Sequence, residues 1–216
     1  MDISPCDTVK VLGVSINNNI RFHSFISKKV QICHYHLRNL CNIRGSLDQS
    51  TRILLVTNLV LSTIDYCNVV LLGASDKDLR PLKLVMNRAV RFIYNLPFRT
   101  HVTPYYKKLH FLQIRYRIKF KASPLGYKCF YKLSPRYLTD EFEVFEVREH
   151  MQSREGIGRD NHMFYINHNE FRSNHLVSHI KREWNSLPLN MRKSESVTVF
   201  KSKLKTLLFT KQFLPY

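Results

Sequence analysis

Two cysteines and two histidines lie close together near the start of the chain and could together bind a zinc ion. They are Cys33, His34, His36 and Cys41. On a helix, however, Cys33 and Cys41 share the apolar face while the histidines point elsewhere. Structural zinc sites also need a tight pair such as Cys-x-x-Cys on each side of the metal. We therefore interpret both cysteines as core residues.

Two further groups of side chains could hold a metal ion, but neither has the pattern of a known site. His175 and His179 lie one turn apart on a predicted helix, and no third ligand can be identified. Acidic side chains gather at Asp140, Glu141, Glu143, Glu146 and Glu149. A metal-dependent nuclease could use such acids, but a solvated acidic connection is the simpler interpretation. We expect no metal and no cofactor.

The sequence motifs of the commonest enzyme classes are missing. There is no Gly-x-Ser-x-Gly, no phosphate-binding Gly-Lys-Ser/Thr loop, no His-Glu-x-x-His and no adjacent pair of aspartates. We therefore predict no catalytic residue; that this chain is not expected to act as an enzyme follows from the family resemblance given below.

Positive charge is concentrated in one quarter of the 216 residues. The chain has 34 Lys and Arg against 16 Asp and Glu, a formal net charge of +18. Residues 77–132 alone hold 14 basic and 1 acidic side chains, a local charge of +13. Such uncompensated charges repel one another unless a polyanion is nearby. This segment is therefore predicted to contact nucleic acid.

One predicted helix in this segment separates apolar from basic side chains. Ser75 can cap its start, and Pro81 is tolerated in its first turn. Seven apolar residues between Leu79 and Ile93 fall within an arc of about 140°, which leaves a row of cations on the other side. The loop and the short helix that follow add more. The predicted phosphate-binding residues are Arg80, Lys83, Arg88, Arg91, Arg99, Lys107 and Lys108.

The remaining elements predict a mainly α fold. The alternation over 8–16 predicts a strand that turns at 17–19 and returns through 20–22 as a β-hairpin. Helices are expected from Ser24 to an end marked by Gly45, from about Asp48 to Tyr66, and after residue 175. Over 114–121 the alternation favours a strand, although the family resemblance given below favours a helix. Pro124 and Gly126 are expected to break any helix there.

Other features bound the compartment and the partners. Five cysteines, an odd number at wide spacing, make a disulfide scaffold improbable. The most apolar run, 53–61, is far shorter than the roughly 20 residues of a membrane span, and no export signal is visible. We expect an intracellular protein, nuclear or cytoplasmic, that has no membrane partner.

Six short strings occur in one order that is specific to a known family. They are Val11-Leu-Gly-Val14; Asp65-Tyr-Cys-Asn68 with Gly73; His101-Val-Thr-Pro104 with Leu109-His110; Ser134-Pro-Arg-Tyr-Leu138; Trp184-Asn-Ser-Leu-Pro188; and Phe200-Lys-Ser-Lys-Leu-Lys-Thr206 with Phe209. Together they closely resemble the carboxy-terminal part of reverse transcriptases from jockey-like non-LTR retrotransposons (LINEs), over nearly the whole chain.

The resemblance implies a division into four parts. Residues 1–22 would be a primer-grip-like hairpin with Leu12 and Gly13 at the grip, and residues 23–139 a thumb-like helical domain. Residues 140–174 would be a flexible connection and residues 175–216 a helical tail. The family's polymerase acids lie in an Asp-Asp box, which this chain lacks, and two-metal phosphoryl transfer needs those carboxylates.

The sequence is thus interpreted as a truncated fragment resembling an RNA-directed DNA polymerase. Its expected partner is RNA or RNA–DNA duplex, bound without sequence preference. Two alternatives stay open at this point: a non-enzymatic protein-interaction module, and a non-functional pseudogene product.

Overall fold

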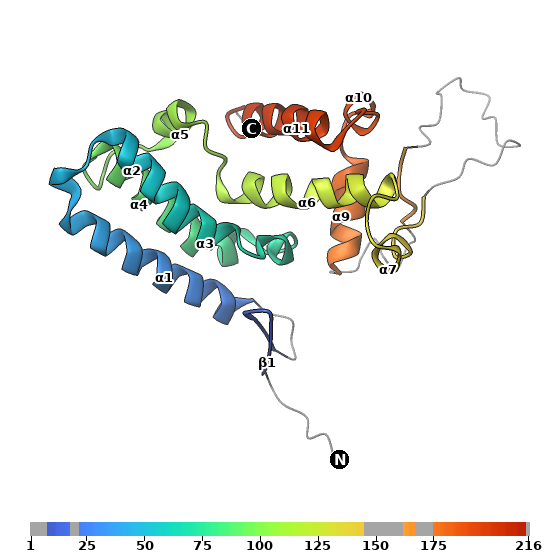
Figure 1. The fold of residues 1–216 in the computed structure, drawn as a ribbon, viewed down its shortest axis with the longest axis horizontal. Coiled ribbons are helices and arrows are strands. Elements are labelled where there is room, and N and C mark those ends of the chain that lie inside the picture. Colours follow the sequence, from blue (N-terminus) through green and yellow to red (C-terminus); the bar gives the residue numbers. More distant parts are fainter. Residues whose placement is uncertain (1–7, 18–21, 145–161, 167–174, 215–216) are drawn as a thin grey trace, which may run out of the picture. The chain divides into compact units, whose positions relative to one another are not determined.

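The protein is mainly helical, as the sequence predicts (Figure 1). The computed structural model describes residues 8–17, 22–144, 162–166 and 175–214. Its elements are β1 Thr8–Val11, β2 Val14–Asn17, α1 His23–Asn42, η1 Arg44–Ser46, α2 Gln49–Leu55, η2 Val56–Leu61, α3 Ser62–Asp65, η3 Asn68–Leu71, α4 Asp76–Tyr94, α5 Thr103–Leu109, α6 Ile114–Phe130, α7 Arg136–Thr139, α9 Leu176–Asn185, α10 Leu189–Arg192 and α11 Val197–Lys211.

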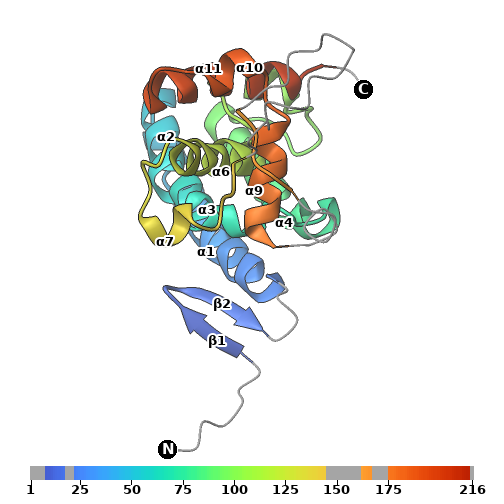
Figure 2. The ribbon, with the colours of Figure 1, turned by 90° about the vertical axis from the view of Figure 1, so that its right-hand side faces the viewer.

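The predicted N-terminal β-hairpin is wrong, because the chain does not continue as one strand over 8–16. It reverses at Leu12 and Gly13 instead, and the segment expected to be one strand pairs with itself, Val11 opposite Val14 (Figure 2). Both turn residues have positive φ, 47° and 82°, as in a type I′ hairpin turn. Leucine is unusual at a position with positive φ. Asparagine tolerates this conformation, which is why the sequence predicted the turn at 17–19. Residues 18–21 lie outside the described residues.

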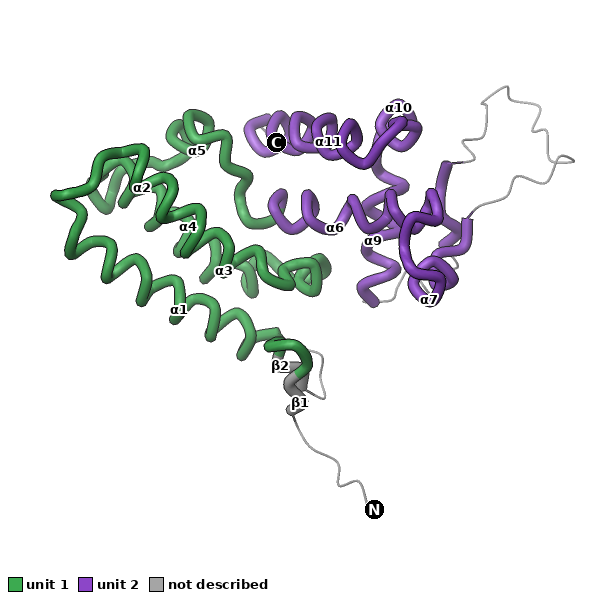
Figure 3. Tube along the Cα trace, viewed as in Figure 1, with its two compact units in different colours: residues 1–115 green, residues 116–216 purple. Residues whose placement is uncertain are grey.

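The chain forms two compact units, residues 1–115 and 116–216 (Figure 3). This division falls inside the predicted thumb-like domain of 23–139. The predicted flexible connection, 140–174, lies largely outside the described residues. At its described ends, Val144 and Phe164 form an antiparallel β-bridge.

Three helical segments build the core of the first unit. α2, η2 and α3 follow one another without interruption, and this segment packs with α1 and α4. Asp48 caps its start by accepting a hydrogen bond from the backbone amide of Thr51 at 3.2 Å. The fully buried side chains between the segments include Cys33, Leu37, Val56, Val60, Ile64, Leu82 and Val85.

Two buried or half-buried cations fasten helix ends in this unit. Lys29, only 4 % exposed, donates from Nζ to the carbonyls of Thr63 at 2.5 Å and Tyr66 at 2.7 Å. These carbonyls lie at the end of α3, where backbone acceptors lack helical partners. Arg52 donates in the same way to the carbonyl of Ile93, near the end of α4, at 2.9 Å. The two side chains therefore hold α1 to α3 and α2 to α4.

In the second unit, α6 is one uninterrupted helix, so the predicted break at Pro124 and Gly126 is wrong. Both residues are buried. A Cβ atom on Gly126 would lie 3.3 Å from Cγ2 of Ile180 and 3.6 Å from Cβ of Trp184. Glycine therefore permits the close approach of α6 to α9, and this packing outweighs the low helix propensity of both residues.

Aromatic rings fill the core of the second unit. Trp184, 0 % exposed, lies with its ring centroid 5.4 Å from that of Phe130 and 5.8 Å from that of Phe200. Its indole Nε1 donates to the carbonyl of His162 at 2.9 Å. The Tyr127 hydroxyl donates to the carbonyl of Ser194 at 2.7 Å. Trp184 is therefore the packing anchor of this unit.

No helix among the described residues is long and apolar enough to cross a membrane.

Candidate nucleic-acid interface

Local sequence fixes where α4 begins and which side of it faces the core. Ser75 caps the helix as predicted, because its Oγ accepts from the amide of Asp78 at 3.2 Å. The predicted apolar arc is buried, as are its neighbours; the buried residues are Leu79, Leu82, Val85, Met86, Ala89, Val90, Phe92 and Ile93. The opposite side of the helix consequently faces solvent.

Three of the predicted cations, Arg80, Lys83 and Arg88, are exposed on that side of α4. At 100° per residue they fall within an arc of about 140°. Arg80 and Lys83 make no hydrogen bond or ion pair with any described residue. The two acids of the first turn are engaged by other groups: Asp76 accepts from Nε and Nη2 of Arg115 at 3.0 and 2.6 Å, and Asp78 accepts from Ser75. The exposed cations of α4 are therefore not neutralised.

Arg88 is held by a histidine of α1. Its Nη1 lies 3.0 Å from Nδ1 of His34, and a guanidinium can only donate. His34 therefore accepts through an unprotonated Nδ1. Burial, the Arg88 charge and then the Arg38 charge lower the pKa of His34. Neither His34 nor the exposed Arg38 was predicted as part of the site; their i, i+4 spacing on one face of α1 was the available signal.

Arg91 is placed differently from the other predicted cations of α4. It is only half-exposed, and its Nη2 donates to the carbonyl of Thr100 at 3.2 Å. Its guanidinium carbon lies 5.5 Å from the ring centroid of Phe98. Arg91 therefore fastens the loop after α4, and less of its charge is available to a ligand than the sequence suggested.

The short helix α5 brings two more predicted cations to α4. Tyr106 donates from its hydroxyl to Oδ1 of Asn87, on the solvent side of α4, at 3.0 Å. Tyr105 packs on Tyr94 with ring centroids 4.8 Å apart. Lys107 and Lys108 are exposed on α5, and Nζ of Lys108 lies 5.6 Å from the Tyr105 centroid. Arg99, in the intervening loop, is exposed and has no polar partner among the described residues.

We call this group of residues the cationic face. It consists of Arg80, Lys83, Arg88, Arg99, Lys107 and Lys108.

Leu12 and Gly13 do not join the cationic face. Leu12 is 83 % exposed, and its carbonyl accepts from the Tyr66 hydroxyl at 2.6 Å. The turn thus lies against Tyr66, the residue after α3, and neither Leu12 nor Gly13 belongs to the segment from α4 to α5 that carries the cationic face.

The metal-site candidates have other roles. Cys33 is fully buried, as predicted, and burial raises the pKa of its thiol to about 11. Cys41 is exposed, so its predicted core position is wrong. Nδ1 of His179 lies 3.2 Å from Nη2 of Arg182. Within the described part of the chain, no three His, Cys, Asp or Glu side chains are arranged to hold a metal ion.

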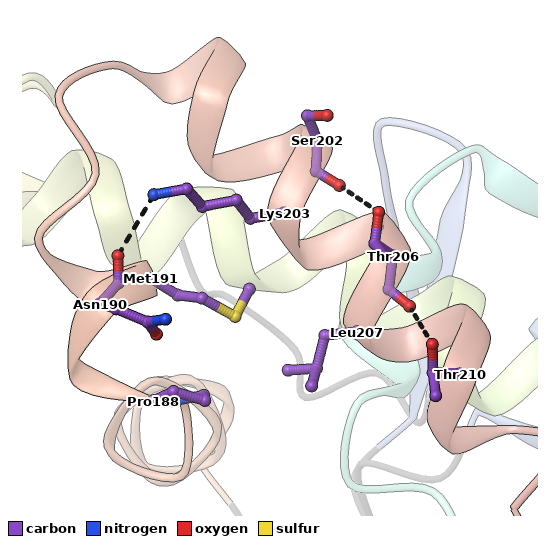
Figure 4. Close-up of a pocket in the computed structure, with 8 residues that line it drawn as sticks. All are labelled: Pro188, Asn190, Met191, Ser202, Lys203, Thr206, Leu207 and Thr210. Carbon is purple, nitrogen blue, oxygen red and sulfur yellow. Dashed lines mark hydrogen bonds between the residues drawn. The ribbon is translucent and has the colours of Figure 1, made fainter.

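A groove lies between α10 and α11 in the second unit (Figure 4). It encloses about 550 Å³. Its polar groups serve the protein itself: Thr206 and Thr210 donate to carbonyls one turn earlier on α11, at 3.2 and 3.0 Å. Lys203 extends toward the carbonyl of Asn190 at 3.4 Å.

Comparison of the chain with protein-family models, with curated proteins and with solved structures found no match. The resemblance to retrotransposon reverse transcriptases therefore stays a prediction.

Proposed function

We propose that the first unit binds RNA or RNA–DNA duplex without sequence preference, through phosphate contacts of the cationic face. The observation that carries this proposal is the exposure of Arg80 and Lys83, with no acidic partner, on the solvent side of a helix whose other side is buried. On an ordinary solubilising face acids and bases alternate, and opposite charges pair. A continuous polyanion is the ligand that relieves this repulsion best.

The spacing of the cations suits a nucleic-acid backbone. Arg80 and Arg88, the first and last cations of this face on α4, are separated by 8 residues and hence by about 12 Å along the helix axis. A single strand of duplex DNA rises about 3.4 Å per phosphate, so α4 spans several phosphates. Arginine and lysine bound to phosphates fix orientation but carry no sequence information. We therefore propose binding governed by charge and shape.

The proposal agrees with the role that the family resemblance implies, in which a thumb-like helical part holds a template–primer duplex. It does not include polymerisation, since the chain has no Asp-Asp box and two-metal transfer requires such carboxylates. The chain would contribute affinity for the duplex and no chemical step.

The experiment compares two triple variants that carry the same charge. The test variant is Arg80→Gln, Lys83→Gln and Arg88→Gln. The control is Lys193→Gln, Lys201→Gln and Lys205→Gln, three exposed lysines of the second unit. Binding of an RNA–DNA duplex is measured against salt concentration. We expect the slope of log K against log salt to become less steep by about 2 to 3 in the test variant, and to change little in the control.

Equal losses in both variants would mean that only net charge matters, and would contradict a defined interface. Retention of an acidic protein partner after nuclease treatment, with unchanged duplex affinity in the test variant, would favour the protein-interaction alternative.

A further inference from the structure

An exposed aromatic side chain lies in the loop between α4 and α5, next to Arg99 of the cationic face. Phe98 is 86 % exposed, more than any other large apolar side chain that the structure describes. A single exposed apolar side chain is ordinary on a protein surface. What distinguishes Phe98 is its backbone and the charges around it.

The backbone presents Phe98 and Arg99 on a closed turn. The amide of Thr100 donates to the carbonyl of Pro97 at 3.1 Å, so Phe98 and Arg99 are the two central residues of a β-turn. Both side chains are exposed. The turn is fastened to α4, because Arg91 donates to the carbonyl of Thr100 at 3.2 Å. A ligand would therefore meet a positioned ring.

Two arginines accompany the ring in different ways. The Arg91 guanidinium carbon lies 5.5 Å from the Phe98 centroid, a cation–π contact that favours one ring orientation. Arg99 has no polar partner among the described residues and is free to bind an anion. An exposed ring beside an unpaired cation matches one nucleotide, which consists of a flat base and a phosphate.

We propose that Phe98 stacks on an unpaired base of RNA or DNA while Arg99 binds a neighbouring phosphate. The proposal rests on the proposed function and extends it, because the cationic face would hold the duplex and Phe98 the single strand that continues from it. In a duplex each base face is covered by its neighbours, so the ring can engage only an unpaired or terminal base. Stacking tolerates any base, in keeping with binding that ignores sequence.

The test measures binding of the full-length chain to two ligands, a blunt RNA–DNA duplex and the same duplex with a short single-stranded extension. We expect the wild-type chain to bind the extended duplex more tightly. Phe98→Ala should remove this gain, a loss of about 5- to 150-fold for the extended ligand, and change the affinity for the blunt duplex far less, because only its terminal base pairs expose a face. Phe98→Trp should keep the gain.

Phe98→Leu separates stacking from general apolar contact, because leucine has no flat face. We expect it to behave like Phe98→Ala. A 2-aminopurine base in the extension supplies a direct readout, since stacking quenches its fluorescence: quenching should occur with wild-type protein and Phe98→Trp and be lost in Phe98→Ala. The exposed position makes misfolding of these variants improbable, and circular dichroism checks it.

The outcomes separate the two proposals. Salt-dependent binding of the blunt duplex, with no gain from the extension or a gain that survives Phe98→Ala or Phe98→Leu, would overturn the stacking proposal alone. Failure of the wild-type chain to bind the blunt duplex would overturn the proposed function.

Discussion

Nη1 of Arg88 lies 3.0 Å from Nδ1 of His34, which joins the cationic face of α4 to α1. The histidine can accept this hydrogen bond only when Nδ1 is unprotonated. The contact therefore ties both the position of Arg88 and the stability of the unit to the protonation state of His34.

The stability of the protein should fall on mild acidification. The pKa of folded His34 lies below its ordinary value of 6.5, because of burial, Arg88 and Arg38. Above about pH 7.5 His34 is neutral in both the folded and the unfolded chain, so it does not make the free energy of unfolding depend on pH there. As the pH falls, the unfolded chain takes up the proton first, so the free energy of unfolding decreases until folded His34 is also protonated.

Denaturation at several pH values, together with NMR titration of His34, tests this expectation. His34→Gln keeps an acceptor for Arg88 but does not titrate, so it should flatten the pH dependence below about pH 7. Some dependence should remain, because burial and Arg182 lower the pKa of His179 in the same direction. His36→Gln, on the same helix, is the control. An unchanged pH profile for His34→Gln would contradict the role of His34.

Replacing the buried Lys29 should weaken the first unit. Lys29→Met keeps the length of the side chain but removes the donor to the carbonyls of Thr63 and Tyr66. A buried acceptor without a partner costs about 1–3 kcal/mol. Because Tyr66 is 54 % exposed, we expect the free energy of unfolding to drop by up to about that amount in chemical denaturation. Lys28→Met, one residue earlier and exposed, should have almost no effect, and equal losses in the two variants would contradict the capping role.

A larger side chain at Gly126 should destabilise the second unit. Gly126→Val would press against Ile180 and Trp184, both fully buried, and overpacking of this kind costs about 1–3 kcal/mol. Gly45→Val is the matched control, because a Cβ atom there meets nothing within 4 Å. Thermal unfolding compares the two variants. If Gly126→Val is no less stable than Gly45→Val, α6 and α9 do not approach as described.

Part of the fold could be predicted because local signals and packing agree. In α4, Ser75 caps the helix and the apolar residues recur at helical spacing, so both the helix and its buried side were predicted and are confirmed. The second helical segment begins at the predicted Asp48 for the same reason.

The prediction failed where two patterns compete in the same residues. In 114–121 the alternation of apolar and basic residues favoured a strand and the family resemblance a helix, and a helix forms. Ile114, Ile118 and Ala122 recur at i, i+4 and are among the residues that α6 buries. Pro124 and Gly126 suggested a break, because the closeness of α9 is not visible in a single sequence. The hairpin failed because Leu12 adopts a positive φ that its residue type does not favour.

The sequence predicted which cations belong to the candidate site, but not the contacts that hold them in place. The number and spacing of cations on α4 follow from helical periodicity, which needs no tertiary structure. The restraint of Arg91 by Thr100, the support of Arg88 by His34 and the exposure of Phe98 depend on contacts between elements. Sequence spacing carries no information about such contacts unless the elements are already placed.

The salt dependence of duplex binding tests the central claim most directly. If the wild-type chain binds an RNA–DNA duplex through four to six phosphate contacts, log K should fall linearly with log salt with a slope of about −4 to −5. Two duplexes of unrelated sequence should give the same line. Affinity that stays flat between low and moderate salt, or that differs strongly between the two sequences, would contradict a cationic face built for phosphates.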